Sequence, residues 1–187
     1  GMLMAVQFMF GNADDRAALT ELPRLGRQLL DDQHAAIRAL SNSQDFDRFV
    51  FLASGANYPL AVEASLKVQE MSISTSEAYH SLEYRHGPKA TADQQTLLCL
   101  VSLSDRQHGL ALARDVKALG VTLLVTGPDA AAYAGIADLA IATGADLGDG
   151  PASAVTLLPL QIMAFETAMR RRQNPDAPAN LSKVVVF

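Results

Sequence analysis

The stretch Thr96-Leu-Leu-Cys-Leu-Val-Ser-Leu103 is almost continuously apolar and holds no charged side chain. Such a run favours a strand that is buried on both faces, as in the middle of a parallel sheet. Val121–Thr126 and Arg48–Ala53 have the same character, and a shorter strand is predicted over Asp138–Ala142. These stretches together predict a mostly parallel sheet.

Helical patterns lie between and around these strands. Residues 58–72 and 107–119 each follow a strand, and residues 151–172 follow the last one. Residues 13–41 precede the first strand, and Pro23 predicts a break or kink in this helix. Strands that alternate with helices in this way predict an α/β fold. We expect a three-layer αβα arrangement with a doubly wound, mostly parallel sheet and N-terminal helices.

Composition excludes several classes of protein. The chain has 187 residues and a net charge of −5, which argues against a nucleic-acid or anionic-membrane partner. Hydrophobic residues make up 49% and charged residues 19%, so the chain is not disordered as a whole. The single cysteine, Cys99, allows no intrachain disulfide, and no Cys/His cluster has zinc-site spacing. We therefore expect no metal, no cofactor and a cytoplasmic protein.

The apolar opening, Met2–Phe10, is not a signal peptide, because it lacks a basic start and a cleavage site. It is also too short to span a bilayer, and no other segment reaches the length of a spanning helix. We interpret it as the last turns of a helix that belongs to a preceding part of a longer protein. The low fraction of charged residues indicates that part of the surface is buried against a partner. Whether the chain is the C-terminal portion of a longer protein stays open.

Three charged residues fall on one face of the helix predicted at 58–72. Glu63, Lys67 and Glu70 are spaced by four and three residues, so they lie side by side. On spacing alone a solvated salt-bridge stripe is the more frequent explanation. The functional alternative is a carboxylate base with a cation beside it, facing a cleft.

Several other residues are candidates for a site. His86 stands before a Gly87-Pro88 turn, although a lone histidine is more often structural or exposed, and we interpret His34, His80 and His108 as surface side chains. The loops after the strands begin at Ser54, Ser102 and Thr126, at the edge where such sheets bind ligands. Ser102-Leu-Ser104-Asp105 can hold a phosphate at a helix N-terminus, but an N-cap turn is the commoner role. Lys183 lies in an apolar tail that is expected to dock.

Four separated segments resemble the sugar isomerase (SIS) domain family, in particular the second SIS domain in the isomerase half of glutamine–fructose-6-phosphate aminotransferase and related phosphosugar isomerases. They are Leu52–Ser72, Glu77-Ala-Tyr79, Glu83-Tyr-Arg-His-Gly-Pro88 and Asn174–Lys183. Residues 1–46 look like the linker helices that leave a first SIS domain. The resemblance thus implies linker helices over 1–46 and a SIS domain over 47–187.

The resemblance also implies roles for the residues that match. Glu70 matches the glutamate that moves a proton between C1 and C2, and Lys67 matches a lysine that settles charge on the enediolate. His86 matches the histidine assigned to ring opening, which in the family reaches a neighbouring subunit. Lys183 matches the tail lysine that closes over the sugar, and Glu63 matches a glutamate on the same face as Glu70.

The sequence departs from the family in two ways. The phosphate-binding Ser/Thr loop of the family belongs to a first SIS domain that this sequence lacks, and Ser54 stands where the aminotransferases have arginine. Glutamine-dependent amination is not expected, because no glutaminase domain is present and Cys99 lies in a predicted buried strand. Substrate contacts are expected from Glu63, and from strand-end residues, namely Ser54, Gly55, Ser102 and Ser104.

We therefore expect a phosphosugar isomerase or aminosugar-phosphate isomerase/deaminase domain. The alternatives are a non-catalytic module that binds sugar phosphates and an incomplete half of a two-SIS enzyme. The partners expected are a sugar phosphate or amino-sugar phosphate, and either a second copy in a homodimer or another SIS domain. In a pair of copies, the loop with Ser102 and Ser104 would be the remaining candidate for a phosphate site.

Overall fold

The structure is a computed structural model that describes residues 8–102, 106–144, 147 and 149–181. Its centre is a five-stranded sheet in the order β2-β1-β3-β4-β5, and all of its pairings are parallel. The strands are β1 (Arg48–Ala53), β2 (Ser76–His80), β3 (Thr96–Val101), β4 (Thr122–Gly127) and β5 (Leu139–Ala142). The predicted parallel sheet is confirmed, with β3 at its middle.

Strand β2 was not predicted from the sequence. Its residues, Ser-Glu-Ala-Tyr-His, form no apolar run, because β2 is the edge strand and most of it is only half-buried. It pairs along β1, with Ala78 opposite Phe51. An edge strand of this kind carries little of the hydrophobic pattern on which a sequence prediction depends.

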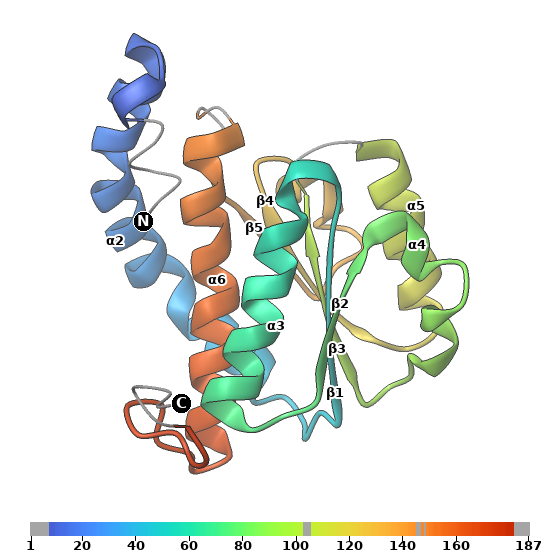
Figure 1. Ribbon diagram of the computed structural model, residues 1–187. Coiled ribbons are helices and arrows are strands. Elements are labelled where there is room, and N and C mark those ends of the chain that lie inside the picture. The colour runs from blue at the N-terminus through green and yellow to red at the C-terminus, as the bar shows by residue number, and fades with distance from the viewer. Residues whose placement is uncertain (1–7, 103–105, 145–146, 148, 182–187) are drawn as a thin grey trace, which may run out of the picture.

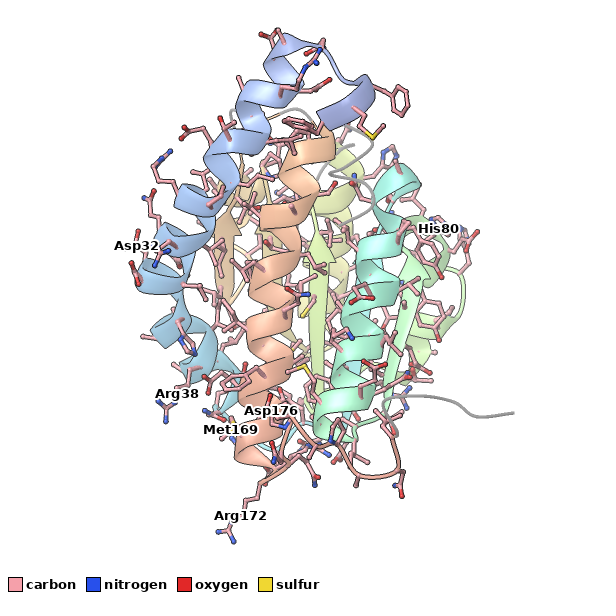
Figure 2. The ribbon with its side chains drawn as sticks, turned by 60° about the vertical axis from the view of Figure 1, so that its left-hand side comes forward. Asp32, Arg38, His80, Met169, Arg172 and Asp176 are labelled. Carbon is pink, nitrogen blue, oxygen red and sulfur yellow. The ribbon has the colours of Figure 1, made fainter. Side chains whose placement is uncertain are left out.

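Helices cover both faces of the sheet, which confirms the three layers. Figures 1 and 2 show α2 (Ala13–Ser41), α6 (Asp149–Arg170) and α3 (Tyr58–Ser72) side by side over one face. Figure 1 shows α4 (Ser81–Tyr84) and α5 (Arg106–Lys117) on the other face. We refer to these as the α3 face and the α5 face.

The core is divided by the sheet into two clusters, and β1 shows how. Phe49, Phe51 and Ala53 pack on the α3 face, whereas Val50 and Leu52 pack on the α5 face. Successive side chains of a strand point to opposite sides, so a strand buried on both faces must be apolar throughout. The continuous apolar runs in the sequence have this origin.

Helix α2 runs from Ala13 to Ser41 with Pro23 inside it, so of the break or kink predicted at Pro23, the break does not occur. Pro23 is exposed, and the carbonyl that loses its helical partner can bond to water on that side. Asn12 and Asp15 form a reciprocal capping box at the start of the helix.

Helix α6 contains a segment, Gly150–Arg170, that is long and apolar enough to cross a membrane by length and composition. Within its most apolar window 67% of the residues are buried inside the protein. The helix packs between α2 and α3 and against the sheet, so its apolar character is accounted for by core packing.

Candidate functional site

The three charged residues of α3 lie together, as their spacing predicted. Lys67 Nζ is 2.6 Å from Glu70 Oε2 and 3.7 Å from Glu63 Oε1. The opposite side of the helix buries Ala61, Ala64 and Val68 against the sheet, which turns the charged residues outward. We call Glu63, Lys67 and Glu70 the α3 triad.

The α3 triad is partly buried, and its central ammonium is firmly protonated. The side chains of Glu63, Lys67 and Glu70 are 39%, 28% and 32% exposed. The hydrogen bond to Glu70 raises the pKa of Lys67, against the opposing effect of partial burial, and the charges of both carboxylates add to the rise. A fixed cation beside a carboxylate can neutralise an oxyanion that forms when that carboxylate removes a proton from carbon.

A second cluster lies at the carboxyl edge of the sheet. Ser54 follows β1 and Ser102 follows β3, and both line a narrow cleft together with Ser81 and His108. This is the point where the strand order reverses, which is where open parallel sheets bind ligands. We call it the switch-point cleft.

The switch-point cleft is small, and three serines line it. Ser102 and Ser81 are 3% and 6% exposed. Within the described part of the chain, no hydrogen bond joins the hydroxyl of Ser54, Ser81 or Ser102 to another group. The cleft measures about 20 Å³, room for one water molecule or one ligand oxygen.

Gly55 is exposed beside this cleft but does not line it. Its φ of 56° opens the short 3₁₀ turn at Gly55–Asn57. Asn57 occupies the N-cap position of α3, although its side chain makes no capping hydrogen bond.

The α3 triad and the switch-point cleft are not one site. Helix α3 begins at Tyr58, at the carboxyl edge of β1, and must run back across the sheet to reach β2, because β1 and β2 are parallel. Glu70 is twelve residues further, which corresponds to about 18 Å along the helix axis. The cleft-lining Leu100 belongs to the core cluster on the α5 face, whereas the triad lies on the α3 face.

His86 lies apart from both clusters. It is exposed in the turn between α4 and the 3₁₀ helix Pro88–Thr91, on the α5 face. The sheet therefore separates it from Glu70 within one chain. Ser104 and Lys183, the remaining predicted site residues, lie outside the described residues.

The interpretation of His34, His80 and His108 as plain surface side chains was wrong in part. His34 Nε2 is 2.5 Å from Glu166 Oε1, a carboxylate that is almost fully buried in α6. His80, at the end of β2, stacks on Tyr58 with ring centroids 4.0 Å apart. His108 is exposed and also lines the switch-point cleft.

The sequence offered little that could have found these contacts. Ser81, His80 and the cleft-lining Tyr133 belong to, or follow, elements that were not predicted. A strand predicted at residues 76–80 would have placed Ser81 after a strand end, as Ser54 and Ser102 are.

Comparison with known proteins now decides the family. A family model described as the SIS domain matches residues 44–170. The chain belongs to the SIS domain family. Among curated relatives, it is 31% identical over 175 residues to glutamine–fructose-6-phosphate aminotransferase [isomerizing] of Synechocystis sp.. It is 34% identical over 177 residues to the protein of that name from Thermosynechococcus vestitus.

These relatives are much longer than the chain. Each alignment covers 89% of this SIS domain chain but only 27% of the relative's length. The activity of the whole relatives therefore does not pass directly to this chain.

Solved structures place the same fold in several phosphosugar enzymes. The C-terminal domain of glucosamine-fructose-6-phosphate aminotransferase from Francisella tularensis has a TM-score of 0.70 at 25% identity, covering 83% of this chain and 44% of that one. Glucosamine-6-phosphate deaminase from Thermotoga maritima has a TM-score of 0.71 at 27% identity, covering 98% and 53%. Tagatose-6-phosphate ketose/aldose isomerase from Escherichia coli reaches 0.82 at 18% identity, covering 96% and 51%, which shows the fold alone.

Proposed function

We propose that this SIS domain supplies the acid–base half of a cytoplasmic phosphosugar isomerase or aminosugar-phosphate isomerase/deaminase, with Glu70 as the group that moves the proton. The observation that carries the proposal is the α3 triad, in which a partly buried ammonium lies 2.6 Å from the Glu70 carboxylate. The relationship to isomerizing aminotransferases supports a phosphosugar as the substrate class.

In the proposed reaction, Glu70 removes a proton from C1 of the open-chain ketose, and the electron pair of that C–H bond forms the C1–C2 double bond of an enediolate. The carbonyl oxygen at C2 takes up the negative charge, which Lys67 neutralises. Glu70 then returns the proton to C2 while a proton moves from the C1 hydroxyl to the C2 oxygen. One carboxylate on one side of the planar enediolate serves both carbons.

The complete site requires more than this face of one chain. We assign ring opening to His86 and closure over the sugar to Lys183, with Glu63 holding Lys67 in place. The phosphate cannot lie in the switch-point cleft of the same chain while C1 lies at Glu70, because the separation of about 18 Å along α3 exceeds the length of a hexose phosphate. A second SIS domain or a second copy would hold the phosphate.

The test is solvent proton exchange, which detects deprotonation even when net conversion is slow. The protein is incubated with fructose 6-phosphate in D₂O, and deuterium at C1 is followed by proton NMR. Glu70→Gln is expected to lower the exchange rate by roughly 10²–10⁴-fold, the usual contribution of a positioned acid–base group. Glu21→Gln is the matched control, because it also removes a carboxylate from an i,i+3 ion pair, on α2. Equal rates in wild type and Glu70→Gln contradict the proposal.

The switch-point cleft favours a second candidate, a non-catalytic sugar-phosphate-binding module. The hydroxyls of Ser81 and Ser102, two serines that are almost fully buried at this cleft, suit an oxygen of a phosphate group. Calorimetry with fructose 6-phosphate and glucosamine 6-phosphate tests it. Binding that is lost in Ser102→Ala, together with no exchange at C1, supports the module, whereas exchange that depends on Glu70 excludes it.

A further inference from the structure

The turn that carries His86 is fixed locally by its own backbone. His86 N–H donates to the Glu83 carbonyl at 3.0 Å, and Ala90 N–H donates to the Gly87 carbonyl at 2.9 Å. Before the turn, Tyr84 is fully buried in the core of the α5 face. These contacts shape residues 81–91, but the two backbone bonds join the turn only to itself.

Arg85 joins this turn to helix α5. Its Nη2 lies 2.7 Å from Asp115 Oδ2. Asp115 is held rigidly, because its neighbours Leu112 and Val116 are fully buried against the sheet. Figure 1 shows α4 and α5 on the same side of the sheet, so the ion pair spans between two covering elements.

The two adjacent residues face different surroundings. Arg85 is half-buried against α5, whereas His86 is exposed and its imidazole has no side-chain partner among the described residues. Arg85 has a helical backbone conformation, and successive side chains of a helical turn project about 100° apart, so Arg85 can contact α5 while His86 faces the solvent. Fixing Arg85 on α5 therefore holds the imidazole of His86 toward the solvent, away from its own chain.

We propose that Asp115 is a positioning residue that sets the orientation of His86 through Arg85. This proposal rests on the proposed function, which assigns ring opening to His86. A purely stabilising role is a weak alternative, because ion pairs this exposed contribute only about 0–1 kcal/mol to folding. The Arg85–Asp115 ion pair therefore orders the turn that carries His86 more than it stabilises the fold.

Amide hydrogen exchange on the full chain tests the positioning directly. Asp115→Asn is expected to speed exchange of the hydrogen-bonded amides of Arg85, His86 and Ala90 by about threefold, and to leave the amides of β3 unchanged. Asp115→Glu, which keeps the charge, should restore most of the protection, and so should the exchanged pair Arg85→Asp with Asp115→Arg. Glu21→Gln, which breaks an exposed ion pair on α2, should change nothing in the turn. Unchanged exchange at residues 85–90 in Asp115→Asn overturns the proposal.

A kinetic measurement separates this proposal from the proposed function. If His86 acts in catalysis, Asp115→Asn should lower kcat severalfold with little change in KM, and Asp115→Glu should recover it. If His86→Ala leaves turnover unchanged while Asp115→Asn still loosens residues 85–90, the positioning contact stands and the assigned role of His86 fails. If His86→Ala lowers turnover but Asp115→Asn changes neither kcat nor the exchange, the role stands and the positioning proposal fails.

Discussion

Tyr84 carries a buried hydroxyl with an uncommon environment. Among the described residues, it is the buried side-chain group for which no hydrogen-bond partner is found. Burial, followed by the nearby Glu77 carboxylate, raises the pKa of Tyr84 to about 12. The folded state therefore holds this proton more tightly than the unfolded chain, where a tyrosine titrates near pH 10.

This difference predicts an alkaline loss of stability. Between pH 10 and pH 12 the unfolded chain releases the proton and the folded chain does not, so the free energy of unfolding should fall by about 2–3 kcal/mol. Tyr84→Phe should remove most of that loss and be neutral or slightly stabilising at pH 7, because the hydroxyl forms no bond. Urea unfolding from pH 8 to pH 12 measures it. Tyr58→Phe, which removes a half-exposed hydroxyl, should keep the loss; a Tyr84→Phe protein that still loses all of it contradicts the assignment.

At the level of residues, the sequence predicted what periodicity controls. The α3 triad was predicted because helical spacing places i, i+3 and i+4 side by side regardless of the rest of the fold. The stack of His80 on Tyr58 and the bond of His34 to Glu166 were not predictable, since each depends on how two different elements pack in space and not on spacing within one element. Such contacts depend on the topology of the fold, and the spacing of residue types along the sequence does not predict them.

Among the elements, β4 ends in a glycine that the sheet requires. Gly127 has a φ of 128°, and a Cβ there would lie 2.3 Å from the carbonyl oxygen of Ser102. The β3 and β4 ends approach this closely because Ser102 N–H donates to the Thr126 carbonyl at 2.7 Å. The same approach holds Ser102 at the switch-point cleft.

Gly127→Ala should therefore lower the free energy of unfolding. Backbone strain alone costs about 1–3 kcal/mol, and the loss should exceed this because the Cβ also meets main chain that cannot move aside. Denaturant unfolding at neutral pH measures the loss. Gly135→Ala is the matched control, because nothing lies within 4 Å of a Cβ there, and it should stay within about 0.5 kcal/mol of wild type. Similar stabilities for the two variants would contradict the close approach.

Helix α2 illustrates an element whose existence was predicted but whose role was not. The sequence suggested a linker over residues 1–46, and that boundary stays a prediction. In the structure, Leu29 and Ile37 of α2 belong to the core cluster of the α3 face. The amphipathic pattern predicted a helix but could not show which surface its apolar stripe meets.

The packing of α2 is testable by truncating a core side chain. Ile37 is fully buried, so Ile37→Ala should lower the free energy of unfolding by about 2–5 kcal/mol. Leu30→Ala, on the same helix but 42% exposed, should change it far less. A single cooperative transition in both variants is expected, because α2 and the sheet share one core. Loss of α2 in a separate, earlier transition would show that it is an independent linker.

For the whole molecule, the sheet itself determines how the candidate site can work. Glu70 lies on the α3 face and His86 on the α5 face, and both are partly or fully exposed. The buried strands of the sheet lie between these two faces. The resemblance implied that His86 reaches a neighbouring subunit, and the position of His86 on the opposite face of the sheet from Glu70 agrees with that expectation.

If both residues serve one reaction, they must come from different copies. Mixing Glu70→Gln with His86→Ala protein, each inactive alone, should then restore about a quarter of wild-type exchange at C1, because half of the randomly formed dimers hold one intact site out of two. Light scattering at micromolar concentration should show a dimer or larger assembly. Each variant mixed with itself is the control. A monomer that exchanges protons at C1 with full dependence on both residues would contradict a shared site, because both side chains would then act within one chain.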